Sequence, residues 1–115
     1  MTNNVVAEKS KLFALRIIKL YNYLKNDKNE YVISKQLLKS GTSIGANIVE
    51  ALRGESKPDF YHKLNIALKE AAETAYWLEL LLLGEYIDET SYKSIANDCE
   101  EIIKLLVSIT KTQKN

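Results

Sequence analysis

The sequence predicts an all-α protein folded as an antiparallel up-down-up-down four-helix bundle. Apolar residues recur every three or four positions over four long stretches, which is the periodicity of amphipathic helices. Turn-forming residues are too scarce for a β-sandwich or barrel, because the 115 residues include four Gly and one Pro. The length fits a single domain over residues 1–115.

The first helix is predicted over residues 5–25. Its apolar seam consists of Phe13, Ile17, Leu20 and Leu24, and we expect basic side chains on the remaining surface. The polar segment 26–30, NDKNE, ends the helix. A link this short predicts that the second helix returns antiparallel.

The second helix, predicted over residues 31–53, contains unusually small residues. Its seam places Gly41 between Leu37 and Ile44, where a large side chain is expected. An interior Gly costs about 1 kcal/mol relative to Ala, so we expect a neighbouring helix to approach closely at Gly41. We expect Gly54 to end this helix in the left-handed conformation.

The third helix is predicted over residues 57–83, with Ser56 as its cap and Pro58 in its first turn. Two apolar faces follow, and a helix that is apolar on two sides is usually buried on two sides. The first face is the core seam, Phe60, Leu64, Ala67, Ala71, Thr74, Leu78 and Leu81. The second comprises Tyr61, Leu68, Ala75 and Leu82, with Ala72, Tyr76 and Leu83 nearby.

The fourth helix is predicted over residues 89–111, with Asp88 as its cap. Its seam reads Tyr92, Ile95, Cys99, Ile102, Leu106 and Ile109. Across the bundle, we expect eight residues above all to be buried: Leu37, Ile44, Ile48, Phe60, Leu64, Leu78, Ile102 and Leu106.

The residues that carry most enzyme chemistry are scarce. One His and one Cys cannot close a tetrahedral zinc site within the chain, and a di-metal site in a bundle needs two Glu-x-x-His pairs. Cys99 falls on a core seam, where we expect an inert thiol, and His62 is interpreted as an ordinary helix-end residue. The prediction is a protein without metal, cofactor or enzymatic activity.

Localisation is predicted from the apolar segments. The N-terminus MTNNVVAEKS has no apolar stretch typical of a signal peptide, and no segment reaches the ~20 apolar residues that a bilayer requires. A single Cys also excludes a disulfide within the chain. We therefore expect a cytoplasmic protein with no membrane segment.

Two groups of residues are candidates for contacts between helices or subunits. Ser43, Asn47 and Glu50 are spaced by four and three, so they form a polar row beside the apolar seam of the second helix. Surplus aromatic residues that cannot all enter one core form the other group, with Tyr61, Tyr76 and Trp77 as candidates. Both groups favour a homo-oligomer, and an unidentified protein partner is compatible with them.

Charge is unevenly distributed along the chain. The net charge is +1, but residues 1–39 hold eight Lys or Arg against three Asp or Glu, a net charge of +5, so the remainder carries −4. The plain interpretation is that these side chains solvate the outer faces of helices. The alternative is a nucleic-acid-binding face on the first two helices, with candidates Lys9, Arg16, Lys19, Lys35 and Lys39.

Two motifs carry a family resemblance that covers most of the chain. One is the SI-x-x-NI-x-E pattern of Ser43, Ile44, Asn47, Ile48 and Glu50, and the other is KE-x-x-ET-x-YWLELL over residues 69–81. With them, the sequence resembles the bacterial four-helix-bundle family named after proteins encoded in 23S ribosomal RNA intervening sequences.

The resemblance implies an antiparallel four-helix bundle that forms ring-shaped homopentamers, in a family with no established enzymatic activity. One relative implied by it is the accessory protein of diversity-generating retroelements, a basic pentameric barrel that binds nucleic acid and associates with a reverse transcriptase. We therefore expect a non-enzymatic assembly module, with a nucleic-acid-associated accessory factor as the alternative.

Overall fold

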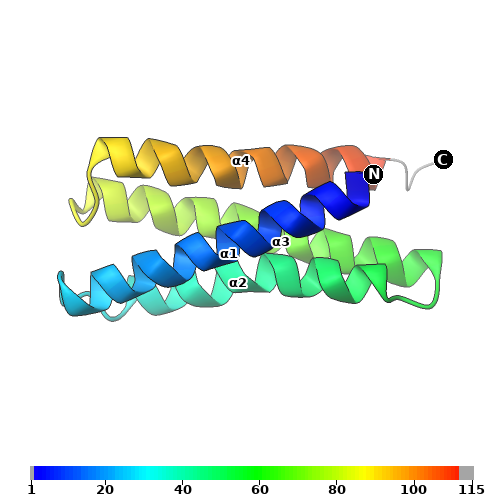
Figure 1. The fold of residues 1–115 in the computed structure, drawn as a ribbon, viewed down its shortest axis with the longest axis horizontal. Coiled ribbons are helices and arrows are strands. Elements are labelled where there is room, and N and C mark those ends of the chain that lie inside the picture. The colour runs from blue at the N-terminus through cyan, green and yellow to red at the C-terminus, as the bar shows by residue number, and fades with distance from the viewer. Residues whose placement is uncertain (1, 112–115) are drawn as a thin grey trace.

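The computed structural model describes residues 2–111, which form an elongated bundle with extents of 46 × 21 × 19 Å (Figure 1). Helix α1 spans Thr2–Asn26, α2 spans Ile33–Leu52, α3 spans Lys57–Leu83 and α4 spans Glu89–Lys111. Successive helices run in opposite directions along the long axis, and residues 2–111 contain no strand. The predicted all-α four-helix bundle is confirmed, although α1 begins before the predicted residue 5.

The core lies between all four helices. Helices α1 and α3 each pack against both α2 and α4, so α1 and α3 occupy opposite corners of the bundle. The predicted seams face this core, and Phe60, near the start of α3, is half-buried against it. The other residues expected above all in the core are buried, namely Leu37, Ile44, Ile48, Leu64, Leu78, Ile102 and Leu106.

Helix α1 approaches α2 closely at two glycines, Gly41 and Gly45, and the approach is tighter at Gly41. A Cβ built on Gly41 would lie 2.8 Å from Cγ1 of Ile17 and 2.9 Å from its Cγ2, which is closer than a real Cβ can come. One turn on, a Cβ at Gly45 would lie 3.2 Å from Oγ of Ser10. The close approach predicted at Gly41 is confirmed, and the neighbour is α1.

The caps expected for α3 and α4 are both present. The hydroxyl of Ser56 accepts a hydrogen bond from the Asp59 amide at 3.2 Å, and Pro58 stands in the first turn of α3. The carboxylate of Asp88 accepts from the Ser91 amide at 2.7 Å, which lowers the pKa of Asp88. These contacts satisfy amide groups that have no partner inside a helix.

The prediction for Gly54 was wrong. None of the glycines in the described residues has a positive φ, and α2 ends with Arg53 at φ −103°. Glycine leaves room there instead, because a Cβ at Gly54 would lie 2.5 Å from Oδ2 at the end of the Asp59 side chain and 3.1 Å from the Ala51 carbonyl oxygen. The left-handed residues are Asn29 and Glu85, which follow α1 and α3.

The first amides of α2 are capped by a residue that was not predicted to do so. The N-cap residue Val32 makes no side-chain capping bond, and the acceptor is instead Glu30. Its carboxylate accepts hydrogen bonds from the amides of Val32, Ile33 and Ser34 at 3.2, 3.0 and 2.7 Å. In return, the Ser34 hydroxyl donates to the Glu30 carbonyl at 2.8 Å. The reciprocal bonds explain how Glu30, a residue only 8% exposed, is accommodated with its carboxylate in the α1–α2 link.

Candidate functional site

The polar row of α2 makes contacts mainly within its own helix. The Ser43 hydroxyl donates to the Lys39 carbonyl at 2.6 Å, and the Asn47 amide donates to the Ser43 carbonyl at 2.8 Å. Glu50 reaches α3, where its carboxylate lies 3.2 Å from Nζ of Lys63. The row therefore lies along the α2–α3 boundary, and Glu50 connects it to α3.

The three aromatic candidates lie on α3 but do not form one cluster. Tyr76 is exposed and its ring stands edge-on to the half-buried Trp77, with centroids 5.2 Å apart. The indole Nε1 of Trp77 is buried, and no hydrogen-bond partner for it exists within residues 2–111. Tyr61 packs edge-on against Phe60 near the start of the helix. Tyr76 and Trp77 are thus neighbours, whereas Tyr61 is remote from them.

Two of the five cations proposed to contact nucleic acid are bound to α4. Nη1 of Arg16 lies 2.6 Å from Oδ2 of Asp98, and its Nη2 donates to the Ser94 hydroxyl at 3.0 Å. Lys9 forms an ion pair with Glu101. These ion pairs connect α1 with α4, so both cations have acidic partners within the chain.

The other three candidates remain exposed. Lys19, Lys35 and Lys39 form no ion pair within the described residues, although Lys39 acts electrostatically on Glu70. Burial raises the pKa of Glu70, and the neighbouring carboxylate of Glu73 raises it further. The unpaired cations are divided between α1 and α2.

The thiol of Cys99 is inaccessible to solvent. Cys99 is buried in the core, where its Sγ lies 3.4 Å from the Ala71 carbonyl, and burial raises the pKa of Cys99 to about 12. Among the described residues, no three His, Cys, Asp or Glu side chains come together to hold a metal ion. Within the same range, none of the helices combines the length and apolar character needed to cross a membrane.

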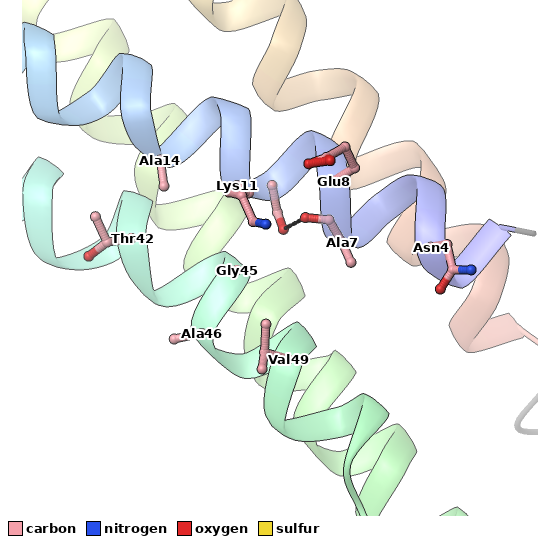
Figure 2. A pocket seen from close by; sticks show the side chains of 10 residues that line it. Asn4, Ala7, Glu8, Lys11, Ala14, Thr42, Gly45, Ala46 and Val49 are labelled. Atoms are coloured by element: carbon pink, nitrogen blue, oxygen red, sulfur yellow. Dashed lines mark hydrogen bonds between the residues drawn. The ribbon is translucent and has the colours of Figure 1, made fainter.

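An open, apolar groove of about 640 Å³ lies between the first half of α1 and the second half of α2. Figure 2 shows Ala7, Lys11 and Ala14 on one wall, with Ala46 and Val49 on the other. The remaining lining residues are Asn4, Glu8, Ser10, Thr42 and Gly45. The small side chains of both walls leave this hollow, which the sequence analysis did not predict.

The outer face of α1 also differs from the expectation that basic residues would cover it. Leu12, Leu15 and Ile18 are exposed there, each three residues from the next. That spacing places them off the Phe13 and Ile17 seam, and it could have been recognised in the sequence. The structure thus shows a mixed apolar and basic face beside the groove.

The comparisons with known proteins agree with the fold. The sequence model of the family described as "23S rRNA-intervening sequence protein" matches residues 2–108. The chain is similar to a protein of unknown function from the S23 ribosomal protein family of Bacteroides thetaiotaomicron VPI-5482, whose crystal structure is known. The two sequences are 60% identical, and the two structures superpose with a TM-score of 0.95. The alignment covers 96% of this chain and 99% of that one. No curated protein gives a significant match. The chain therefore belongs to the 23S rRNA-intervening sequence protein family.

Proposed function

We propose that this protein is a non-enzymatic helical module that assembles with copies of itself into a ring, as a pentamer. The observation that carries the proposal is the set of large apolar side chains left exposed on helices α1 and α3, together with an apolar groove between α1 and α2. Contiguous apolar surface of this kind is typical of protein contact sites. The pentamer number comes from the family resemblance.

A role without catalysis is supported by the chemistry of the described residues. Cys99 is buried with a raised pKa, and Ser43 donates its hydroxyl proton to a backbone carbonyl of its own helix. Neither group is arranged as an activated nucleophile, which needs an adjacent base. The exposed apolar side chains and the apolar groove are instead suited to binding another protein.

Sedimentation velocity across a micromolar dilution series tests the assembly. We expect one oligomeric species whose sedimentation coefficient does not change over the series. A species with the mass of one chain, 13.1 kDa, throughout the series would contradict the proposal.

The alternative function is association with RNA or DNA through α1 and α2. It is supported by Lys19, Lys35 and Lys39, which are exposed and lack ion pairs within residues 2–111. A ring would repeat these cations, and each phosphate neutralised adds close to one unit to the salt dependence of binding. Lys9 and Arg16 contribute less, because their charges are paired with α4.

A titration with structured RNA and duplex DNA at two salt concentrations tests this alternative. The variant Lys19→Glu, Lys35→Glu removes free cations without breaking an ion pair, and Lys69→Glu, Lys104→Glu on α3 and α4 is the matched control. Micromolar binding that weakens with salt and is lost only in the first variant would support nucleic-acid association. Absence of binding at low salt would contradict it.

A further inference from the structure

Helix α1 presents a large apolar face to solvent. Leu12, Leu15 and Ile18 are 56%, 52% and 40% exposed, although Leu and Ile side chains gain from burial. At 100° per residue, Leu15 points away from the side of α1 that carries Phe13 and Ile17 into the core. These three residues, called here the α1 face, therefore have no covering element within the described chain.

The α1 face is continuous with the groove between α1 and α2. Lys11 and Ala14 line the groove, and Leu15 and Ile18 each lie one turn further along the same side of α1. Val49, on the opposite wall, is also exposed. Face and groove together form one apolar surface with a hollow at one end, which is the shape needed to receive side chains from another helix.

Helix α3 presents a second apolar face. Tyr76 is 54% exposed and Leu83 is 70% exposed, with the small, exposed Ala72 one turn before Tyr76. The ring of Tyr76 is supported edge-on by Trp77. We call Ala72, Tyr76 and Leu83 the α3 face. Tyrosine rings supported in this way are frequent in protein interfaces.

The charges that flank the two faces are opposite. Residues 11–19 of α1 contain Lys11, Arg16 and Lys19 and no acid. Because Arg16 is paired with Asp98, the free positive charge comes from Lys11 and Lys19, which form no ion pair within the part of the chain that the structure describes. Residues 72–83 of α3 contain Glu73 and Glu79 and no Lys or Arg. Neither of these acids forms an ion pair within residues 2–111.

The two faces cannot meet within one chain. Helices α1 and α3 lie at opposite corners of the bundle, and each face points away from the core. Contact between them therefore requires two copies. The combination of apolar exposure with opposite charge favours such a contact over the pairing of two α1 faces, which would bring Lys11 and Lys19 near their own counterparts.

We propose that copies of this chain associate head to tail, with the α3 face of one copy packed on the α1 face and groove of the next. The inference rests on the proposed function and specifies its interface. Because the two surfaces differ, a head-to-tail assembly keeps an unused α1 face at one end and an unused α3 face at the other, and it stops growing when these two ends meet in a closed ring.

Two variants that each block one face test the proposal by light scattering. Leu15→Glu blocks the α1 face, and Tyr76→Glu blocks the α3 face; both sites are exposed, so circular dichroism should show unchanged helix content. Val32→Glu, at an exposed apolar residue just before α2, is the matched control. We expect each blocked variant to have the mass of one chain and the control to assemble as the wild type does.

Mixing the two blocked variants distinguishes head-to-tail contact from other modes. Each keeps one intact face, and the two blocked faces both carry an added Glu, so the mixture should form one-to-one pairs and nothing larger. Continued assembly of Tyr76→Glu alone, or a mixture that stays monomeric, would overturn the proposal while leaving the oligomer itself intact. A monomeric wild type would instead refute the proposed function.

Discussion

Arg16 joins α1 to α4 through Asp98, with Nη1 and Oδ2 2.6 Å apart. The same guanidinium reaches the carbonyl and the hydroxyl of Ser94. Arg16, which was predicted as a candidate for binding phosphate, thus instead connects two helices of the bundle. This pair explains why a helix with many cations does not present all of them to a partner.

Charge reversal at Arg16 should lower stability slightly. Both side chains are 40% or more exposed, so solvent screening limits the pair to about 0.5–1 kcal/mol. Urea denaturation should show Arg16→Glu less stable than Lys19→Glu, which breaks no ion pair, and Asp98→Arg should restore part of the loss in Arg16→Glu. Equal stability of the Arg16 and Lys19 variants would contradict a contribution from this pair.

Gly41→Ala should destabilise the bundle. The new methyl group would overlap Ile17, and overpacking costs about 1–3 kcal/mol, which exceeds the ~1 kcal/mol gained in helix propensity. Gly45→Ala is the control, because its nearest neighbour is Ser10 Oγ at 3.2 Å and a small shift suffices. If thermal denaturation gave the two variants the same stability, close packing at Gly41 would not be the reason for glycine there.

The buried hydroxyls of Ser40 and Thr74 lie 2.8 Å apart and connect α2 with α3. Thr74→Val alone should cost about 1 kcal/mol, because a buried hydroxyl loses its partner across the helices. Ser40→Ala combined with Thr74→Val should cost less than the sum of the single changes, because no buried polar group is then left behind. Strictly additive free energies in this double-mutant cycle would show that the two hydroxyls act independently.

Glu30 should make stability depend on acid pH. Burial raises its pKa, but the hydrogen bonds from Ile33, Ser34 and Val32 outweigh burial and hold the pKa below its ordinary value. The stabilisation is therefore complete above the ordinary pKa of about 4.5 and is lost as the pH falls through the lowered value.

Glu30→Gln should thus lose about 1–2 kcal/mol at neutral pH and show a smaller decline below about pH 4.5 than the wild type. Chemical denaturation from pH 7 to pH 3 measures both curves, and their difference isolates Glu30 from Asp88, whose pKa is also lowered. Parallel curves would mean that the capping bonds do not favour the ionised carboxylate.

The helices were predictable because their information is local. The three-and-four spacing of Phe13 and Ile17 and the cap at Ser56 act within a few residues, and even the close approach at Gly41 follows from an absent side chain. The cap at Glu30 was missed because a Glu before a helix resembles the polar residues of any turn. Gly54 was misread because it does not have a positive φ, and the absence of a Cβ there leaves room for the Asp59 side chain instead.

The candidate site was less predictable because it depends on which helices become neighbours. The sequence identified Tyr76 as a surplus aromatic residue, and the structure places it on an exposed face. The sequence alone could not show that Arg16 would contact Asp98, 82 positions away, or that Ala14 and Ala46 would line one groove. Leu12, Leu15 and Ile18 were recognisable as an unpaired apolar row, but basic residues beside them suggested a solvated surface.

The mass of the wild-type protein in solution decides whether these bundles assemble into a ring. Light scattering at micromolar concentration measures this mass without a probe or a variant. We expect the mass of a pentamer of the 13.1 kDa chain. A mass of two chains would contradict the head-to-tail ring, and a mass of one chain would contradict assembly altogether.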